Sequence, residues 1–146
     1  MPVERNEINN SEDELIVQQA WYFGDGSHAY ACMDGSRVIA LCFFWYGERY
    51  RQRNFWPLAD KEAKLVQLIV LPEMRGRGIA SNLIKFSTKD MSRRGFRYMY
   101  ARIWWSNTPS LHVFERAGWR RVATVFEIYL LDRKKPFRLK LMRMFS

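Results

Sequence analysis

The chain has 146 residues, of which 48% are hydrophobic and 16% aromatic, and its formal net charge is +9. This composition excludes a fibrous or disordered chain and fits one globular domain over residues 1–146. No apolar run approaches the roughly 20 residues that span a bilayer, Met1 to Glu14 lacks a signal peptide's pattern, and two cysteines, Cys32 and Cys42, are too few for a four-ligand zinc site. We therefore expect a cytoplasmic protein with no metal and no membrane partner.

Hydrophobic patterning divides the chain into strands and helices that follow an atypical N-terminal segment, residues 1–27. That segment has room for one helix, from Glu12 to Trp21, after a cap at Ser11. Strands are predicted over residues 28–33, 38–46, 63–71, 98–104 and 119–131, and helices over residues 78–94 and 108–117. The first two strands form a hairpin around the turn at residues 34–37, and the charged, aromatic residues 47–60 form a loop.

Two details of this pattern decide the predicted architecture. The strand at residues 63–71 is apolar almost throughout, which is typical of a central strand buried on both faces. The helix after it has apolar positions, Phe86 among them, near helical spacing, and it ends at Gly95. The second helix is predicted to begin with a Thr108 cap before Pro109. This order of elements predicts an α/β sandwich in which helices cover a mixed sheet.

The positive charge is concentrated at the C-terminal end. Residues 133–146 hold six Lys or Arg side chains and no acid, which leaves only +3 for the rest of the chain. A basic tail of this kind motivates a nucleic-acid-binding hypothesis, which predicts binding that falls steeply with salt. The alternation of apolar residues with Arg138 and Lys140 instead indicates a solvated terminal strand. We favour the basic C-terminal strand or tail and do not expect a nucleic-acid partner.

The segment between the central strand and the first long helix carries the most information. It reads Leu68-Ile69-Val70-Leu71-Pro72-Glu73-Met74-Arg75-Gly76-Arg77-Gly78-Ile79-Ala80-Ser81. A glycine-rich turn that opens a helix directs several backbone N–H groups at one point, where the helix dipole adds positive charge. Gly76 and Gly78 let a ligand approach the backbone, and the two arginines add donors. The segment therefore predicts a pyrophosphate site, although it matches neither a Walker A loop nor the dinucleotide fingerprint.

The same residues resemble the acetyl-CoA signature of the GNAT N-acetyltransferase superfamily, Arg/Gln-x-x-Gly-x-Gly/Ala, at Arg75, Gly78 and Ala80. A second segment is similar to the family's Asn-x-x-Ala/Ser and Tyr-Glu-Lys-x-Gly-Phe motifs; it comprises Asn107, Ser110 and Phe114-Glu115-Arg116-Ala117-Gly118-Trp119. Two motifs in the right order are harder to match by chance than one. The resemblance implies a mixed, mostly antiparallel central sheet flanked by helices, with the N-terminal strand and helix region shortened.

The resemblance also implies a co-substrate, acetyl-CoA or another acyl-CoA, and roles for the matched positions. The positions implied to bind it are Leu68, Ile69, Val70, Arg75, Gly76, Arg77, Gly78, Ile79, Ala80, Ser81 and Asn107. The backbone of the strand would bind the pantetheine arm, and the amides of the turn would hold the pyrophosphate. An amine, on a small molecule or a protein, would attack the thioester directly, and a strand N–H near Ile69 would stabilise the oxyanion.

Three positions depart from the catalytic pattern of that family. The carboxylate position early in the central strand is Lys64, the alternative position on the next strand is Arg102, and the acid tyrosine is Phe114. Glu62 leaves the same face of the strand as Lys64, so it could accept the amine's proton directly or through water, or merely pair with Lys64 or solvent. Lys64 and Arg102 could alternatively hold an acceptor that carries a carboxylate or phosphate.

Other candidate residues have equally ordinary explanations. His112 could shuttle a proton, but a histidine at this place is more typical of a helix surface. Aromatic residues that could line an acceptor pocket, or simply pack in the core, are Phe43, Phe44, Trp45, Tyr46, Tyr50, Phe55 and Trp56. Trp104 and Trp105 could border the acyl site.

Three functions remain open from the sequence. The leading one is an acyl-CoA-dependent N-acyltransferase, most simply an N-acetyltransferase. The alternative is a catalytically weak or inactive acyl-CoA-binding sensor or interaction module, because the usual catalytic groups are replaced. The nucleic-acid-binding domain rests on the tail alone. The short N-terminal segment is compatible with a shortened variant, a fragment, or a domain completed by a partner, and a homodimer is left open.

Overall fold

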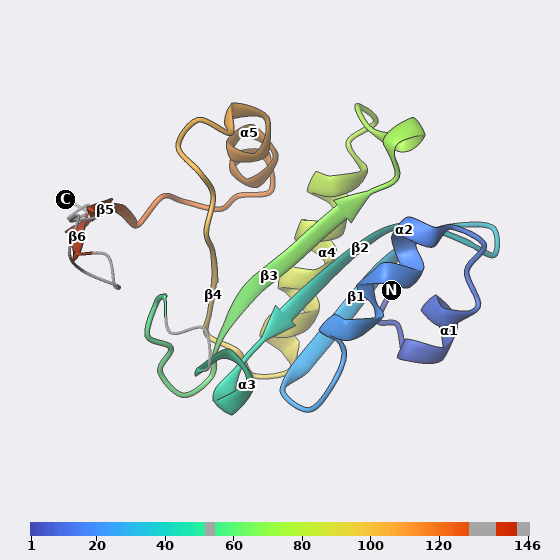
Figure 1. Cartoon of the computed structure of the whole chain (residues 1–146), viewed down its shortest axis with the longest axis horizontal. Helices are drawn as coiled ribbons and strands as arrows, with labels where there is room; N and C mark the ends of the chain where they lie inside the picture. The colour runs from blue at the N-terminus through green and yellow to red at the C-terminus, as the bar shows by residue number, and fades with distance from the viewer. Residues whose placement is uncertain (52–54, 129–136, 143–146) are drawn as a thin grey trace.

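A computed structural model describes residues 1–51, 55–128 and 137–142, and these fold as a mixed sheet with helices on both faces, together with a separate hairpin (Figure 1). The strands are β1 Ser27–Asp34, β2 Arg37–Trp45, β3 Glu62–Val70, β4 Tyr98–Ala101, β5 Ala123–Ile128 and β6 Phe137–Met142. The helices are α1 Arg5–Asn9, α2 Glu14–Val17, α3 Gly47–Arg51, α4 Ile79–Arg93 and α5 Thr108–Arg116, with short 3₁₀ turns η1 Gln18–Tyr22 and η2 Pro72–Met74. The predicted fold class is confirmed.

The main sheet has the strand order β1-β2-β3-β4, so β3 is an interior strand, as predicted. β1 and β2 form the expected antiparallel hairpin, and β2 pairs antiparallel with β3. β3 and β4 run parallel, which makes the sheet mixed but mostly antiparallel. β5 and β6 form a second, two-stranded antiparallel sheet.

The parallel pairing of β3 with β4 covers only the first part of β3. It runs from Glu62 opposite Tyr98 to Leu65 opposite Ala101. β4 therefore ends three residues before Trp104, and that part of the prediction was wrong. Among the described residues, β3 pairs only with β2 from Val66 onward. One backbone edge of the second half of β3 therefore has no strand partner.

The pairing of β2 with β3 contains a bulge at the point where β4 diverges. Phe43 lies opposite Gln67 and Phe44 lies opposite Leu65, so Val66 is an extra residue on β3. A bulge bends its strand and increases the local twist, and bulges are frequent next to functional sites. The bend at Val66 helps to separate the second half of β3 from β4.

Two hydrophobic clusters sandwich the sheet. On one face α4 and α5 pack Leu83, Ile84, Met91 and Phe114 against the sheet. On the other face the N-terminal helices contribute Ile8 and Ile16, among other residues. Each fully buried aliphatic side chain of this kind contributes about 1.5–3 kcal/mol to folding.

The buried face of α4 differs from the prediction at one position. Phe86 is 47% exposed, whereas Ser87 is fully buried. The Ser87 hydroxyl donates to the carbonyl of Ile84 at 3.1 Å, which satisfies its polar group within the helix. Hydrophobicity alone therefore assigned Phe86 to the wrong side of the helix.

The N-terminal segment is more regular than the sequence indicated. Instead of one helix from Glu12 to Trp21, it contains α1, α2 and η1, and the cap of α2 is Asp13. The residues before α1 are extended along β1: the Val3 amide donates to the Ala29 carbonyl at 3.1 Å, and Pro2 forms a bridge with Tyr30. A short extended segment thus pairs with the outer edge of β1. Helices of four or five residues give no readable periodicity, which explains the error.

The remaining predictions have mixed outcomes. The predicted loop at 47–60 contains α3. The predicted strand at 119–131 begins four residues later than expected, as β5, and its last three predicted residues lie outside the described chain. The terminal strand exists as β6, and the rest of the basic tail lies outside the described residues. Both cysteines are free, and burial raises the pKa of the Cys42 thiol to about 12. No described helix is long and apolar enough to cross a membrane.

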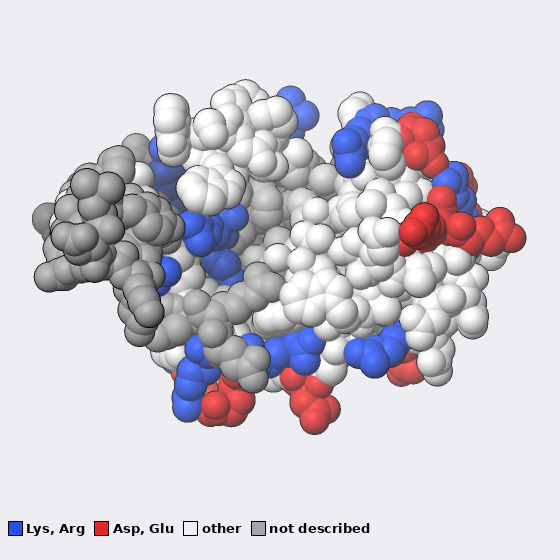
Figure 2. Space-filling model, viewed as in Figure 1, with Lys and Arg blue, Asp and Glu red and all other residues white. Residues whose placement is uncertain are grey.

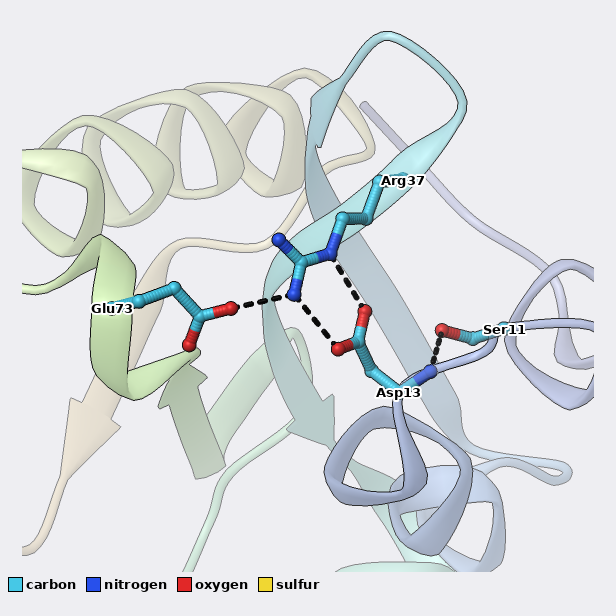
Figure 3. Close-up of polar contacts among 4 residues, drawn as sticks. All are labelled: Ser11, Asp13, Arg37 and Glu73. Carbon is cyan, nitrogen blue, oxygen red and sulfur yellow. Dashed lines mark hydrogen bonds and ion pairs between the residues drawn. The ribbon is translucent and has the colours of Figure 1, made fainter.

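Arg37, at the start of β2, connects the N-terminal segment to η2 (Figure 3). Its guanidinium donates to both carboxylate oxygens of Asp13, at 2.8 and 2.9 Å, and to Glu73 of η2 at 2.5 Å. The hydrogen bond from Arg37 lowers the pKa of Asp13. Because η2 leads directly into the glycine-rich turn, this ion pair helps to position that turn.

Candidate functional site

The unpaired edge of β3 presents backbone groups from alternate residues. The Leu71 amide donates to the Ile39 carbonyl at 2.9 Å. Hydrogen-bonded pairs alternate in an antiparallel ladder, so Ile69 also directs its N–H and C=O toward β2. Leu68 and Val70 direct theirs the other way, to the side that β4 has left. The cleft is therefore lined by the backbone of Leu68 and Val70. The N–H groups near Ile69 that face the cleft are those of Leu68 and Val70.

The cleft ends at the glycine-rich turn. Gly76 and Gly78 have left-handed φ angles of 75° and 74°, a conformation that costs other L-residues about 1–2 kcal/mol. A Cβ at either position would meet no protein atom within 4 Å. Packing therefore does not require glycine here; the backbone conformation does, and the open side is available to a ligand.

The first turn of α4 supplies the donors of this site. Gly78 is the N-cap, so the amides of Ile79, Ala80 and Ser81 have no acceptor within the helix. With the helix dipole they favour an anion at this end. Arg75 extends the site only in part, because its Nε donates to the Val70 carbonyl at 3.2 Å. The residues match what a pyrophosphate group requires.

α5 forms the opposite wall of the cleft. The hydroxyl of Ser81 donates to the Val113 carbonyl at 3.3 Å, which ties the first turn of α4 to α5. The space-filling view has a notch between α5 and the turn that precedes α4 (Figure 2). Leu68, Val70 and the predicted positions at the start of α4 therefore lie along one continuous edge, whereas the backbone of Ile69 faces β2. The glycine-rich turn and the backbone of the strand are thus parts of the same site.

Asn107 has a structural task that the sequence assigned to Thr108. It is the N-cap of α5, and its Oδ1 accepts the Ser110 amide at 3.3 Å. Thr108 is already the first residue of the helix, so the predicted cap was wrong by one position. The Asn107 side chain is at the α5 end of the cleft, and a cofactor contact from its amide nitrogen stays a prediction.

The two tasks of Asn107 can be separated by substitution. Asn107→Asp keeps a good cap but replaces the amide donor with a negative charge, so we expect unchanged stability and an affinity for acetyl-CoA about tenfold lower. Asn107→Ala is expected to lose about 1 kcal/mol of stability as well. Thermal melts and calorimetric titrations measure both quantities. An Asn107→Asp variant that binds acetyl-CoA as the native chain does would leave Asn107 with the capping role alone.

Glu62 and Lys64 do not form the pair that the sequence allowed. The Glu62 carboxylate accepts the Ala59 amide at 2.9 Å, and within the described residues no ion pair joins it to Lys64. Glu62 lies at the first residue of β3, about 13 Å from the bulge at Val66 by strand rise. Any proton transfer between Glu62 and an amine at the bulge would require intervening water.

Lys64 is a buried cation. Its relative exposure is 6%, and burial, followed by the charge of Arg102, lowers its pKa to about 8. Its ammonium lies 5.6 Å from the centre of the Phe55 ring, and the Arg102 guanidinium lies 3.9 Å from the same centre. Arg102 also lies 4.8 Å from the centre of the Trp104 ring. The two predicted acceptor-binding cations are thus brought together on one aromatic ring.

Two further cations, missed by sequence reasoning as site residues, join this group from β6. The Arg138 guanidinium lies 5.0 Å from the centre of the Phe55 ring, and the Lys140 ammonium lies 3.5 Å from the centre of the Trp56 ring. We call Lys64, Arg102, Arg138 and Lys140, with Phe55 and Trp56, the basic cluster. Only the alternation in the tail hinted that β6 exists, and nothing local indicated which surface it would contact.

The other candidates fall mostly into the core or onto the surface. Phe43, Phe44 and Trp45 are buried in the sheet, and Phe114 packs against Trp119. His112, Trp104 and Trp105 are exposed. A cavity of about 680 Å³ adjoins the basic cluster at Trp56 and is also lined by Glu62, at the end of β3 far from the glycine turn. Among the described residues no group of His, Cys, Asp or Glu side chains could hold a metal ion.

Comparison with known proteins gives one family and one fold. The family model described as "Acetyltransferase (GNAT) family" matches residues 3–119. No curated protein matches the chain in sequence.

Several solved structures share the fold at low sequence identity. An aminoglycoside acetyltransferase, meta-AAC0020 from an uncultured soil metagenomic sample, in complex with trehalose, has a TM-score of 0.64 at 12% identity, covering 91% of this chain and 95% of that one. An IAA acetyltransferase from Bacillus cereus ATCC 14579 has a TM-score of 0.61 at 14% identity, covering 98% and 97%. Aminoglycoside N-acetyltransferase AAC(6')-Iy in complex with CoA has a TM-score of 0.55 at 22% identity, covering 77% and 78%.

Proposed function

The chain belongs to the GNAT acetyltransferase family, and on this premise we propose that it is an N-acyltransferase that moves an acyl group, most simply acetyl, from a coenzyme A thioester to an amine. The observation that carries the proposal is the separation of β3 from β4, which directs the backbone of Leu68 and Val70 into a cleft that ends at the Gly76–Gly78 turn.

Acetyl-CoA fits this cleft by the chemistry of its parts. Its pantetheine arm contains amides, which suit the backbone edge of Leu68 and Val70 that has no strand partner. Its pyrophosphate suits the amides at the start of α4, where charge-assisted hydrogen bonds and the helix dipole act together. Arg77 adds an exposed cation at the rim of this turn. The cofactor requires no metal in this arrangement.

The reaction needs little from side chains. The acceptor's amine nitrogen attacks the thioester carbonyl, so that a C–N bond forms and the C–S bond breaks. The Leu68 N–H donates to the oxygen on which negative charge develops. The amine's proton leaves to water, with Glu62 as the proposed final acceptor, and the departing thiolate takes a proton from solvent. Placing the two reactants in one cleft supplies much of the acceleration.

A second candidate function is an acyl-CoA-binding module with weak or no turnover. It is favoured by Lys64 at the position of the family's usual carboxylate and by Phe114, which is buried in the core where a tyrosine would supply the acid. The two functions share the cofactor cleft and differ only in whether an amine reacts.

The acceptor named for two of the similar structures is not transferred to this chain. Aminoglycosides are polycations, and the acceptor side of this cleft holds the basic cluster. The positive charges of such an acceptor and of the basic cluster would repel one another within the cleft, even after screening by salt. The chemistry of the acceptor is therefore considered separately below.

A direct assay distinguishes the two functions. The full chain is incubated with acetyl-CoA and a mixed panel of amines, and the release of free CoA thiol is followed. Amine-dependent release supports the N-acetyltransferase. Binding of acetyl-CoA with no release by any amine supports the binding module, and a folded chain that binds no form of coenzyme A contradicts both.

A further inference from the structure

The basic cluster is assembled from segments that are distant in sequence. Phe55 and Trp56 come from the loop before β3, Lys64 from β3, Arg102 from the chain that leaves β4, and the last two cations from β6. Three of the four cations lie between 3.9 and 5.6 Å from the centre of a single ring, that of Phe55. Tertiary folding, not local sequence, therefore concentrates the charge.

The burial of the Lys64 charge beside the charge of Arg102 is unfavourable for the protein alone. Cation–π contacts contribute about 0.5–2 kcal/mol each, but mutual repulsion and the burial of Lys64 oppose them. Within the described residues no ion pair joins Lys64 to a carboxylate, and the nearby acid Glu62 is hydrogen-bonded to the Ala59 amide. Figure 2 shows Lys and Arg side chains gathered in a recess over β4, while the acidic side chains visible on this face lie toward its edges. An anion in the recess would remove the repulsion.

The cluster lies on the acceptor side of the cleft. Lys64 precedes the bulge at Val66 by two residues and Leu68 by four, which corresponds to about 13 Å of strand. A lysine side chain is about 6 Å long and covers part of that distance. An elongated acceptor, whose amine and anionic group are on the order of 7–13 Å apart, can therefore reach Leu68 and Lys64 at the same time. Phe55 and Trp56 offer an apolar surface to the part between them.

We propose that the acceptor is a small primary amine that also carries a carboxylate or phosphate group, held by Lys64 and Arg102 over the ring of Phe55, and that polycationic amines are rejected. This inference rests on the N-acetyltransferase function proposed above. The anion sets the orientation of the acceptor, and the amine reaches the thioester as a consequence. Arg138 and Lys140 add long-range attraction from β6.

The test compares amines that differ only in the anionic group. The full chain is supplied with acetyl-CoA and with 6-aminohexanoate or 6-aminohexanamide, 8-aminooctanoate or 8-aminooctanamide, 6-aminohexyl phosphate or 6-aminohexanol, and spermidine as the polycation. Thiol release gives kcat/KM for each, and calorimetry on the chain saturated with CoA gives each affinity. We expect at least one anionic member to exceed its neutral partner by tenfold or more in kcat/KM or affinity. The amino acids and the phosphate compound distinguish a carboxylate from a phosphate.

Substitutions then locate the preference. Lys64→Met and Arg102→Gln are each expected to reduce the affinity for the preferred anionic amine by about ten- to hundredfold, and to leave the affinity for acetyl-CoA unchanged. Lys89→Met, on the exposed side of α4, is the matched control and should change neither.

The outcomes separate this inference from the function on which it rests. Neutral amines or spermidine that bind and react as well as their anionic counterparts, on a chain that binds acetyl-CoA, would overturn the inference and keep the function. An anionic preference that survives both substitutions would also overturn it. Failure to bind acetyl-CoA at all would contradict the proposed function instead.

Discussion

Gly78→Asp is expected to weaken acetyl-CoA binding by at least about a hundredfold. The residue caps α4 with a φ of 74° and has open space beside it, where the pyrophosphate is proposed to bind. A carboxylate about 5 Å from a phosphate charge costs about 3 kcal/mol at an effective dielectric constant of 20, which is roughly a hundredfold in affinity. Calorimetric titration with acetyl-CoA measures the loss.

Gly78→Asn is the matched control for this substitution. Asn and Asp have the same shape, and both tolerate the left-handed conformation better than other residues. The asparagine variant should therefore bear the same backbone strain and bulk but retain far more affinity than the aspartate variant. Gly118→Asp places the same charge at another left-handed glycine with open space, after the end of α5, and should bind acetyl-CoA normally. Equal affinities for Gly78→Asp and Gly78→Asn would contradict a pyrophosphate at this turn.

Lys64→Met should stabilise the free protein by about 1–3 kcal/mol at pH 7. Lowering the Lys64 pKa from 10.5 to about 8 corresponds to about 3 kcal/mol of destabilisation of the folded state while the lysine is charged. Methionine keeps the apolar stem and removes the charge. The loss of the cation–π contact with Phe55 reduces the stability gain by about 0.5–1 kcal/mol. Denaturant unfolding at pH 7 measures the difference.

The pH dependence of stability in the native chain and in Lys64→Met gives an independent check that the Lys64 charge is buried. Below pH 8 the lysine is charged in both states and the full penalty applies. Between pH 8 and 10.5 the unfolded chain binds more protons, so the native chain gains stability with rising pH relative to the variant. Above pH 10.5 the difference in stability between the native chain and Lys64→Met should disappear. Lys89→Met, at an exposed site, should differ from the native chain by no more than about 0.5 kcal/mol at any pH; a Lys64→Met variant that behaves like it would refute the burial of this charge.

The sequence predicted best the elements whose pattern is long. The apolar run of β3, the periodicity of α4 and the turn between β1 and β2 each specify their own structure, and all three were found near their predicted bounds. The short helices α1, α2 and α3 were missed or merged because four or five residues do not complete a readable period. β4 was predicted too long, because alternation of side chains does not reveal where a partner strand ends.

The site was predictable where it is built from one segment. Gly76 and Gly78 could be read as a phosphate-binding turn because strand, turn and helix are consecutive. The choice of Leu68 over Ile69 required the register of β2 against β3, which depends on the bulge at Val66. Arg138 could be assigned to the basic cluster only once the position of β6 in the fold was known, and no local sequence pattern indicates that position.

The buried cation at position 64 is the observation outside the cofactor cleft on which the proposed acceptor chemistry depends most. A methionine at position 64 would fill the same space without the cost of burying a charge. Stability alone therefore does not account for a lysine at this position, whereas the proposed anionic acceptor does. The stability gain and the loss of acceptor binding in Lys64→Met are thus two results of one cause.

The measurement that most directly tests the central claim is calorimetric titration of the full chain with acetyl-CoA, with ATP as the control ligand. The account predicts micromolar binding of acetyl-CoA, with one site per chain, and much weaker binding of ATP, which lacks the pantetheine arm that the backbone of Leu68 and Val70 would bind. No heat of binding with acetyl-CoA or CoA, from a sample whose circular dichroism confirms that it is folded, would contradict it.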